Sequence, residues 1–156
     1  MELELAKYIG TKLIKAKPMT RGEYNEYRGW KIPENENPQD EGYLVVYVDS
    51  NDYVSWSPKD VFERAYKSCC DGMTFGGALE LLKMGFKVAR KGWNGKNQYI
   101  ELATGISYKN VSGHIVNCEH DSIGNNAIAF VGTSGVQMGW LASQADMLAS
   151  DWVVVE

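Results

Sequence analysis

The sequence has 156 residues, of which 44% are hydrophobic, 12% are aromatic and 23% are charged, and its formal net charge is −4. This length suits one ordinary domain or two very small ones, and the composition is typical of a soluble globular protein with a real core. The negative net charge argues against a general nucleic-acid binder, which would need a broad basic surface. Binding of a small anionic ligand is still possible, because a pocket needs only local positive charge.

No apolar run in the sequence is long enough to cross a bilayer, and the opening residues MELELAKYIG lack the apolar segment of a secretory signal. Cys69 and Cys70 are adjacent and Cys118 lies far from them, which is an odd number of thiols for a disulfide framework. We therefore expect reduced thiols in a cytoplasm, with no membrane partner.

The first predicted elements are an edge-like strand over residues 7–17, with outward lysines, and a short helix that begins at Thr20. Thr20 and Glu23 have the spacing of a capping box, in which each side chain bonds the backbone N–H of the other residue. The segment 32–42 is rich in Pro, Asn and acidic residues, which predicts a loop. An aromatic cluster precedes this loop and comprises Tyr24, Tyr27 and Trp30.

A β-hairpin is predicted next. Residues 43–48 and 53–56 are β-branched and aromatic, and the polar residues 49–52 form the turn between them. Ser57 and Pro58 then predict the start of a helix, with Ser57 as its N-cap. The expected buried face of this helix comprises Val61, Phe62, Ala65 and Tyr66.

The second half of the chain opens with a helix that Thr74 caps. Gly85 follows at the position where a helix ends in the left-handed conformation, and residues 87–90 alternate like a half-buried strand. The apolar face of the helix has helical spacing and comprises Phe75, Ala78, Leu79 and Leu82.

The rest of the chain is predicted as strands and loops. Residues 99–102 form a short strand, and 105–113 form a loop or ragged hairpin. A hairpin of 127–131 and 136–140 surrounds a four-residue turn, and 152–155 form the final strand. The predicted fold class is α+β, with antiparallel β-sheets and a few short α-helices.

The two halves share an ordered set of motifs, which indicates an internal duplication and divides the chain into an N-terminal α+β module, 1–70, and a second domain, 71–156. In each half a capped helix has an Asp at its third position, which can bond the first N–H groups of the helix. We assign Asp60 this role alone, whereas a ligand contact also stays open for Asp146. The matched motifs are Met19-Thr20 with Met73-Thr74, Arg28-Gly29-Trp30 with Lys91-Gly92-Trp93, and Trp56-Ser57-Asp60 with Trp140-Ser143-Asp146.

The strongest chemical signal is a local reversal of charge. Between Leu81 and Ile100 there are five Lys or Arg residues and no acidic residue, and the turn after the 87–90 strand presents Trp93 and Asn94 among these cations. An aromatic face with nearby cations suits a planar base attached to a phosphate. The alternative is that Trp93 fills a core and the lysines form a solvated face.

Other chemistry has weaker support. His114 lies near Cys118 and His120, with acidic neighbours, but their spacing matches no standard zinc pattern, and we expect no metal and no cofactor. No phosphate-binding loop, nucleophile elbow or paired zinc cysteines occur. Asp146 and Asp151 could form an acid–base pair, but five residues apart on one helix they would point in different directions, so we expect no enzyme.

Two motifs carry a resemblance to a known family. The run MTFGGALELLKMGFKVARKGWNGK (73–96) and the segment WLASQADMLASDW (140–152) resemble the second type of phage Thoeris anti-defence protein. The resemblance covers about residues 72–156, and the region 102–137 does not align with confidence. The N-terminal module lies outside it.

This resemblance implies a function. Members of that family act as sponges in the host cell cytoplasm: they bind cyclic nucleotide second messengers of bacterial immunity, glycocyclic ADP-ribose or cyclic dinucleotides, and hold them unhydrolysed. They assemble as homotetramers with pockets at subunit contacts. The alternatives are an enzyme that degrades such signals and a phage accessory interaction module without a small ligand.

We expect two walls of a ligand pocket, one from the 90–96 turn and one from the 140–146 segment. Trp93 would stack on a base, and Arg90 or Lys96 would face a phosphate. Asn94 would bond a base edge or a ribose, and Asp146 would accept from a ribose hydroxyl or a base amine. The full set of expected ligand-binding residues is Phe75, Arg90, Trp93, Asn94, Lys96, Trp140, Ser143, Gln144 and Asp146.

Overall fold

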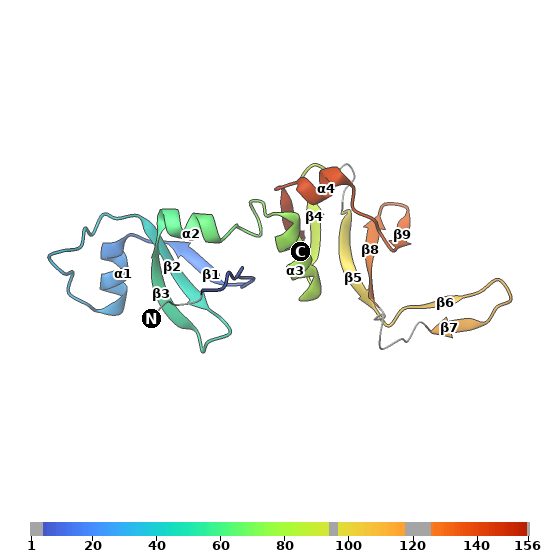
Figure 1. Ribbon diagram of the computed structural model, residues 1–156, viewed down its shortest axis with the longest axis horizontal. Coiled ribbons are helices and arrows are strands. Elements are labelled where there is room, and N and C mark those ends of the chain that lie inside the picture. The colour runs from blue at the N-terminus through green and yellow to red at the C-terminus, as the bar shows by residue number, and fades with distance from the viewer. Residues whose placement is uncertain (1–4, 94–96, 118–125, 156) are drawn as a thin grey trace. The chain divides into compact units, whose positions relative to one another are not determined.

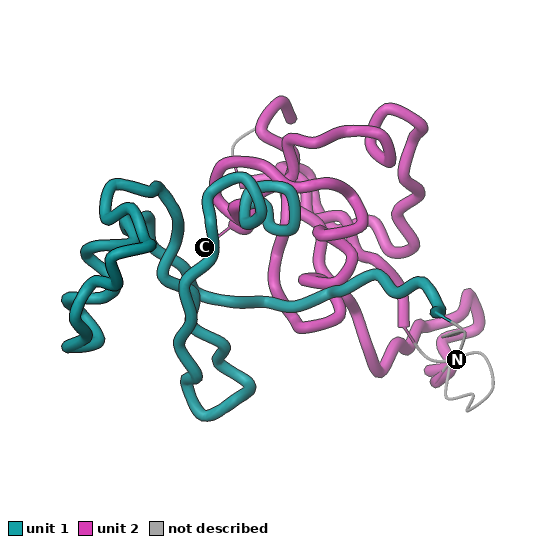
Figure 2. The backbone as a smooth tube through the Cα atoms, turned by 60° about the vertical axis from the view of Figure 1, so that its left-hand side comes forward, with its two compact units in different colours: residues 1–67 teal, residues 68–156 magenta. Residues whose placement is uncertain are grey.

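The computed structural model describes residues 5–93, 97–117 and 126–155. Within these residues the chain forms antiparallel β-sheets and four short helices (Figure 1), which confirms the predicted α+β class. The chain divides into two compact units, unit 1 from Met1 to Lys67 and unit 2 from Ser68 to Glu156 (Figure 2). In the described part of the chain, no helix is long and apolar enough to cross a membrane.

Unit 1 is built on a three-stranded antiparallel sheet with the order β1-β2-β3, and Val45 in the central strand is almost completely buried. Its elements are β1 (Lys15–Pro18), α1 (Arg21–Arg28), β2 (Gly42–Tyr47), β3 (Tyr53–Pro58) and α2 (Lys59–Ala65).

The start of α1 confirms the predicted capping box. Thr20 Oγ1 accepts from the Glu23 N–H at 3.2 Å, and Glu23 Oε2 accepts from the Thr20 N–H at 2.7 Å. The predicted aromatic cluster is also present, because Tyr24 packs edge-on against Trp30 at 6.0 Å and lies 6.4 Å from Tyr27. The predicted strand over 7–17 is shorter than expected, because its pairing with β2 covers only Lys15–Pro18.

The prediction for α2 was partly wrong. Ser57 belongs to β3, where it pairs with Tyr43, so the N-cap is Pro58 and no side chain caps the helix. Val61 and Ala65 are exposed rather than buried. Of the four residues predicted for the buried face, only Phe62 and Tyr66 pack against other rings. The ring centroid of Phe62 lies 4.1 Å from that of Tyr43 and 5.0 Å from that of Tyr66.

Unit 2 contains a five-stranded antiparallel sheet with the order β10-β4-β5-β8-β9 and a separate hairpin of β6 and β7. The hairpin accounts for the segment predicted as a loop or ragged hairpin. The elements of unit 2 are α3 (Phe75–Lys83), β4 (Lys87–Arg90), β5 (Tyr99–Thr104), β6 (Ser107–Lys109), β7 (Ile115–Asn117), β8 (Asn126–Gly132), β9 (Gly135–Met138), α4 (Gln144–Leu148) and β10 (Trp152–Val155).

Helix α3 begins and ends as the sequence predicts. Thr74 Oγ1 accepts from the Gly77 N–H at 3.3 Å. At the other end Gly85 has φ +92°, and the N–H groups of Gly85 and Phe86 donate to the Leu82 and Leu81 carbonyls, each at 3.0 Å. This reversed pair of bonds is a Schellman motif. The buried residues are Ala78, Leu81 and Leu82, so Leu81 takes the place expected for Leu79.

The core of unit 2 lies between α3 and one face of the sheet. Helix α3 packs on β4, β5 and β10 (Figure 1), and Val88, Ile100 and Trp152 beneath it have no exposed surface. The segment before α3 also belongs to this unit, because the Val154 N–H donates to the Cys69 carbonyl at 2.9 Å and Met73 exchanges two backbone bonds with Trp152. These bonds tie the residues before α3 to unit 2, which begins at Ser68.

The two units share local features but not the same sheet. Met19 and Met73 each precede a Thr N-cap, and their N–H groups donate to the strand carbonyls of Gly42 and Trp152. The sheets, however, have three and five strands. An internal duplication stays a prediction.

Candidate ligand-binding site

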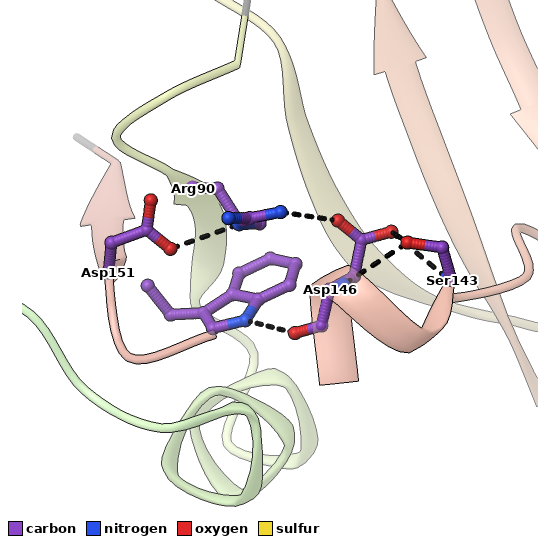
Figure 3. A network of polar contacts seen from close by, with 5 residues as sticks. Arg90, Ser143, Asp146 and Asp151 are labelled. Carbon is purple, nitrogen blue, oxygen red and sulfur yellow. Dashed lines mark hydrogen bonds and ion pairs between the residues drawn. The ribbon is translucent and has the colours of Figure 1, made fainter. Parts of the chain in front are cut away.

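The site is organised around the guanidinium of Arg90, the last residue of β4. Its Nε–H donates to Asp151 Oδ1 and its Nη1–H donates to Asp146 Oδ1, each at 3.0 Å (Figure 3). Asp146 lies in α4, and Asp151 lies just before β10. The end of β4 is thereby joined to α4 and to the start of β10, through residues 56 and 61 positions further along the chain.

The expectation that Asp146 and Asp151 lie on one helix and point apart was wrong. Helix α4 ends at Leu148, and the next residues turn the chain back toward β10. Both carboxylates consequently point to Arg90 (Figure 3).

Asp146 also completes the capping box of α4. Its Oδ2 accepts from the Ser143 N–H at 3.0 Å and from the Ser143 hydroxyl at 2.7 Å, while Ser143 Oγ accepts from the Asp146 N–H at 3.1 Å. The structural role predicted for Asp146 is confirmed. The carboxylate thus accepts three hydrogen bonds within the chain, which fixes its orientation.

These contacts keep all three groups charged. Burial opposes ionisation of Asp146, but the hydrogen bonds from Ser143 and then Arg90 outweigh it and lower the pKa of this carboxyl. The hydrogen bond from Arg90 is the main reason why the pKa of Asp151 is lowered. The pKa of Arg90 is raised by Asp151 first and by Asp146 second. One cation faces two anions, so Arg90 is not an isolated positive charge.

Next to this ion-pair network lies a tryptophan cluster, which we define as Trp93, Phe130, Trp140 and Trp152. Trp93 lies at its centre, with its ring centroid 5.4 Å from Phe130, 5.9 Å from Trp140 and 5.3 Å from Trp152, all edge-to-face. Trp152 is completely buried, whereas Trp93 and Trp140 are partly exposed. The Trp152 Nε1–H donates to the Asp146 carbonyl at 2.9 Å, which connects the cluster to the network.

The structure brings together most of the expected ligand-binding residues. Arg90, Ser143 and Asp146 belong to the network, Trp93 and Trp140 to the tryptophan cluster, and Phe75 contacts Trp152 at 5.4 Å between ring centroids. Gln144 lies in the first turn of α4 with an exposed side chain. Asn94 and Lys96 lie outside the described residues. The roles of all these residues toward a ligand stay predictions.

Sequence reasoning missed three members of the site. Phe130 lies in an apolar run that carries no signal beyond that of a strand. Trp152 was predicted only as the last residue of the 140–152 motif and the first residue of the final strand. Asp151 was considered and set aside, because its distance from Asp146 was read along a helix that does not extend that far.

Reactive groups are few in the described part of the chain. Among residues 5–93, 97–117 and 126–155, no group of three His, Cys, Asp or Glu residues could hold a metal ion. Cys118 and His120, considered as metal ligands with His114, lie outside these ranges. Burial raises the pKa of the Cys69 thiol, so this thiol is protonated at neutral pH and a poor nucleophile.

The fold and the site together describe a small α+β domain whose ion-pair network and tryptophan cluster lie at one end of an antiparallel sheet. The model of the Tad2-like family, the Thoeris anti-defense 2-like domain, matches residues 73–155, and the chain belongs to this family. The protein named Thoeris anti-defense 2 of Bacillus phage SP01 is 40% identical over 88 residues, which cover 53% of this chain and 94% of that protein.

These comparisons confirm the resemblance seen in residues 72–156, and they support a role in phage anti-defence. The matched region lies within unit 2 and contains the whole ion-pair network and tryptophan cluster. Unit 1 lies outside it.

Proposed function

We propose that the protein binds cyclic nucleotide messengers of bacterial immunity and holds them unhydrolysed, so that the host effector is not activated. The observation that carries this proposal is the juxtaposition, inside the family-matched unit, of two partly exposed indoles with a fixed guanidinium and two carboxylates. A cyclic nucleotide offers a base, ribose hydroxyls and phosphates. Each of these groups has a chemical counterpart here.

Base binding would use the indoles. Trp93 and Trp140 are held edge-to-face at 5.9 Å, and the rings around them restrict their rotation. A ring that is already fixed loses little conformational entropy when a base stacks on it. Partial exposure leaves part of each ring open to a ligand.

Ribose binding would use the acids. Asp146 already accepts three hydrogen bonds, and its side chain is only 15% exposed. The side chain of Asp151 is 35% exposed and accepts from Arg90 through Oδ1. We therefore move the acceptor role for a ribose hydroxyl from Asp146 to Asp151, because its carboxylate is the more accessible one.

Phosphate binding would use Arg90 in combination with other donors. Two carboxylates offset its charge, so electrostatic attraction by Arg90 alone would be weak. The same carboxylates hold the guanidinium rigidly, and it has further N–H groups besides the two that they bind. Lys91 follows it directly, with its Nζ–H donating to the Asp71 carbonyl, and Lys96 comes six residues after Arg90 in the sequence; both would supply the additional positive charge.

The binding free energy that a sponge needs supports a pocket formed between copies of the chain. To starve an effector, a sponge must bind on the order of nanomolar concentrations, which corresponds to about −12 kcal/mol. A base stacked on one aromatic ring contributes roughly 1–3 kcal/mol, so stacking alone is insufficient. The ligand must be enclosed, and a contact between copies of a small chain encloses more than one copy does. We therefore propose a homo-oligomer, with a homotetramer as the expected form.

We propose no catalytic step. A general acid must be protonated at the working pH, whereas the network lowers the pKa of both Asp146 and Asp151. As general bases, both would be weakened by their hydrogen bonds to Arg90.

The test is a capture experiment. The protein is mixed separately with glycocyclic ADP-ribose and with cyclic dinucleotides, freed of unbound ligand by gel filtration, denatured, and the released material is analysed by mass spectrometry. We expect intact ligand in a fixed ratio to protein. Linearised product that increases with protein and time would establish the enzyme instead, and an absence of capture for all of these ligands would favour an interaction module.

A further inference from the structure

The start of unit 1 carries a second local reversal of charge, which the proposed function does not use. Between Glu4 and Glu23 the sequence has five Lys or Arg residues and no acidic residue, in a chain whose net charge is −4. The last of the five, Arg21, forms a salt bridge with Glu36 at 2.6 Å. The other four form no salt bridge with any residue that the structure describes, and they are Lys7, Lys12, Lys15 and Lys17. We define residues 5–17 as the basic segment.

Large apolar side chains are interleaved with these lysines. Leu5, Tyr8 and Ile9 are 87%, 94% and 94% exposed. A single exposed apolar residue is common on a protein surface, but three of them within five residues form a patch that is unfavourable in water. Residues 5–14 belong to no helix or strand, so a partner can cover these side chains without breaking secondary structure.

The end of the basic segment is held in the sheet of unit 1. In the edge strand β1, Lys15 lies opposite Val46 and Lys17 lies opposite Leu44. Directly opposed residues of antiparallel strands share a face, so each lysine stands beside a half-buried apolar residue. Tyr43, the neighbour of Leu44, points to the other face, where α2 packs. Lysines on an edge strand also discourage pairing with a foreign strand, but this explains neither the earlier lysines nor the apolar side chains among them.

We infer that the basic segment binds the surface of an anionic lipid membrane. Peripheral binding combines attraction of cations to acidic headgroups with burial of apolar side chains at the headgroup boundary, and the basic segment offers both. A nucleic acid would satisfy the lysines alone, because Leu5 and Ile9 have no aromatic face on which a base can stack. Tyr8 also suits lipid, since aromatic rings with a polar tip favour the membrane interface.

This inference revises one expectation drawn from the sequence. The expected absence of a membrane partner followed from the absence of a spanning apolar run, and binding at the membrane surface needs no such run. The lipid contact lies in unit 1 and is independent of nucleotide capture, which we assign to unit 2.

The test is sedimentation of the full-length protein with lipid vesicles. One set contains phosphatidylglycerol and phosphatidylcholine in equal amounts, and the other contains phosphatidylcholine alone. We expect the protein to sediment with the anionic vesicles at low salt. Binding should be at least about tenfold weaker at high salt or with the neutral vesicles, because both remove the attraction between lysines and headgroups.

Charge reversal tests the cations. Lys7→Glu with Lys15→Glu should weaken binding to the anionic vesicles by at least about tenfold, since each lysine near such a surface contributes about fivefold. Both side chains are exposed, so the fold should be unaffected. Lys31→Glu with Lys109→Glu is the matched control, because it changes the net charge equally at exposed positions outside the basic segment. The control should lose less than about threefold, since salt screens distant charges.

A second pair of variants tests the apolar side chains at unchanged charge. Tyr8→Ser with Ile9→Ser should also weaken binding by at least about tenfold, because the burial at the headgroup boundary is lost. Val111→Ser with Leu148→Ser, at positions 109% and 81% exposed in unit 2, is the control and should bind like the wild type.

Three results would overturn the inference. They are a wild type that stays in the supernatant with anionic vesicles, a wild type that binds single-stranded DNA but not vesicles, and a charge-reversed variant that binds vesicles as the wild type does. Nucleotide capture is measured on the same proteins and should be the same in all of them. Failure of the wild type to capture nucleotide would count against the proposed function alone.

Discussion

At the scale of single residues, Arg90 is the centre of the site, because it forms ion pairs with two acids. It pairs with two carboxylates and connects β4 with α4 and with the start of β10. A residue in this position serves stability whether or not it also contacts a phosphate. Substitutions at Arg90 must therefore be read for stability before they are read for binding.

Removal of this guanidinium should destabilise the protein. Arg90→Ala leaves two partly buried acids facing each other, and we expect the free energy of unfolding to fall by about 1–3 kcal/mol, measured by urea denaturation. Arg64→Ala is the matched control, because Arg64 pairs only with the exposed Asp60 at 3.7 Å and should change stability little. Equal effects of the two variants would contradict the structural role of Arg90.

The two acids should make stability depend on pH. Their pKa values are lower in the folded state, so the unfolded state binds more protons as the pH falls past about 3.9, the ordinary value for Asp. Their contribution is complete above about pH 5 and is lost as the pH falls through the lower folded pKa. The stability difference between wild type and Asp151→Asn should consequently shrink from pH 6 to pH 3. A difference that stays constant would show that Asp151 is not held ionised by Arg90.

Trp93 should matter for both stability and binding. Three rings surround it, so Trp93→Ala should cost stability as well as capture, and that variant cannot separate the two roles. A pair of milder variants can. Trp93→Phe keeps an aromatic face and Trp93→Leu keeps only apolar volume, so we expect similar melting temperatures but roughly 5- to 150-fold weaker capture for Leu than for Phe. Equal capture by both would exclude stacking on Trp93.

At the scale of elements, the ends of α3 determine how it is placed on the sheet. Thr74 fixes its start, and the left-handed Gly85 turns the chain into β4, which carries Arg90. The position of the site thus depends on a helix end that lies outside it.

Two glycine substitutions, one at each end of α3, should affect the free energy of unfolding differently. Gly85→Ala forces a side chain into φ +92° and should lower the free energy of unfolding by about 1–2 kcal/mol. Gly76→Ala in the first turn has only the Thr74 hydroxyl near its new Cβ, at 3.7 Å, and should be neutral or stabilise by up to about 1 kcal/mol. Urea denaturation measures both. A stabilising Gly85→Ala would contradict the Schellman end of α3.

At the scale of the whole molecule, the chain consists of a family-matched unit and a second unit outside the match. Each unit has its own buried residues, with Val45 in unit 1 and Val88, Ile100 and Trp152 in unit 2. Separate cores allow separate unfolding.

We therefore expect calorimetry to show two transitions. Val45→Ala removes buried methyl groups from unit 1 and should lower one transition by about 2 kcal/mol of stability. Gly85→Ala should lower the other. If each substitution moved both transitions together, the units would form one cooperative body.

The sequence by itself predicted those features that depend on residues close together in the chain. The Thr20–Glu23 box, the Thr74 cap, the Gly85 helix end and the strands at 87–90 and 152–155 involve bonds or patterns within a few positions. Such bonds form with little loop closure, so local sequence suffices to specify them. The family motifs lie in the same segments. Where a local rule failed, at Ser57, pairing with a distant strand had removed the residue from the helix.

Only the tertiary structure decided which of these segments meet. Arg90 lies 56 and 61 positions from Asp146 and Asp151, and Trp93 contacts Phe130 across two strands. The decisive step is the placement of β10 beside β4, at the far side of the sheet from β9. Strand order and register are set by burial of side chains over the whole sheet, and the pattern within one strand does not reveal its neighbours. For this reason the sequence could name Arg90, Trp93 and Asp146 separately, but it could not show that Arg90 is held between two acids.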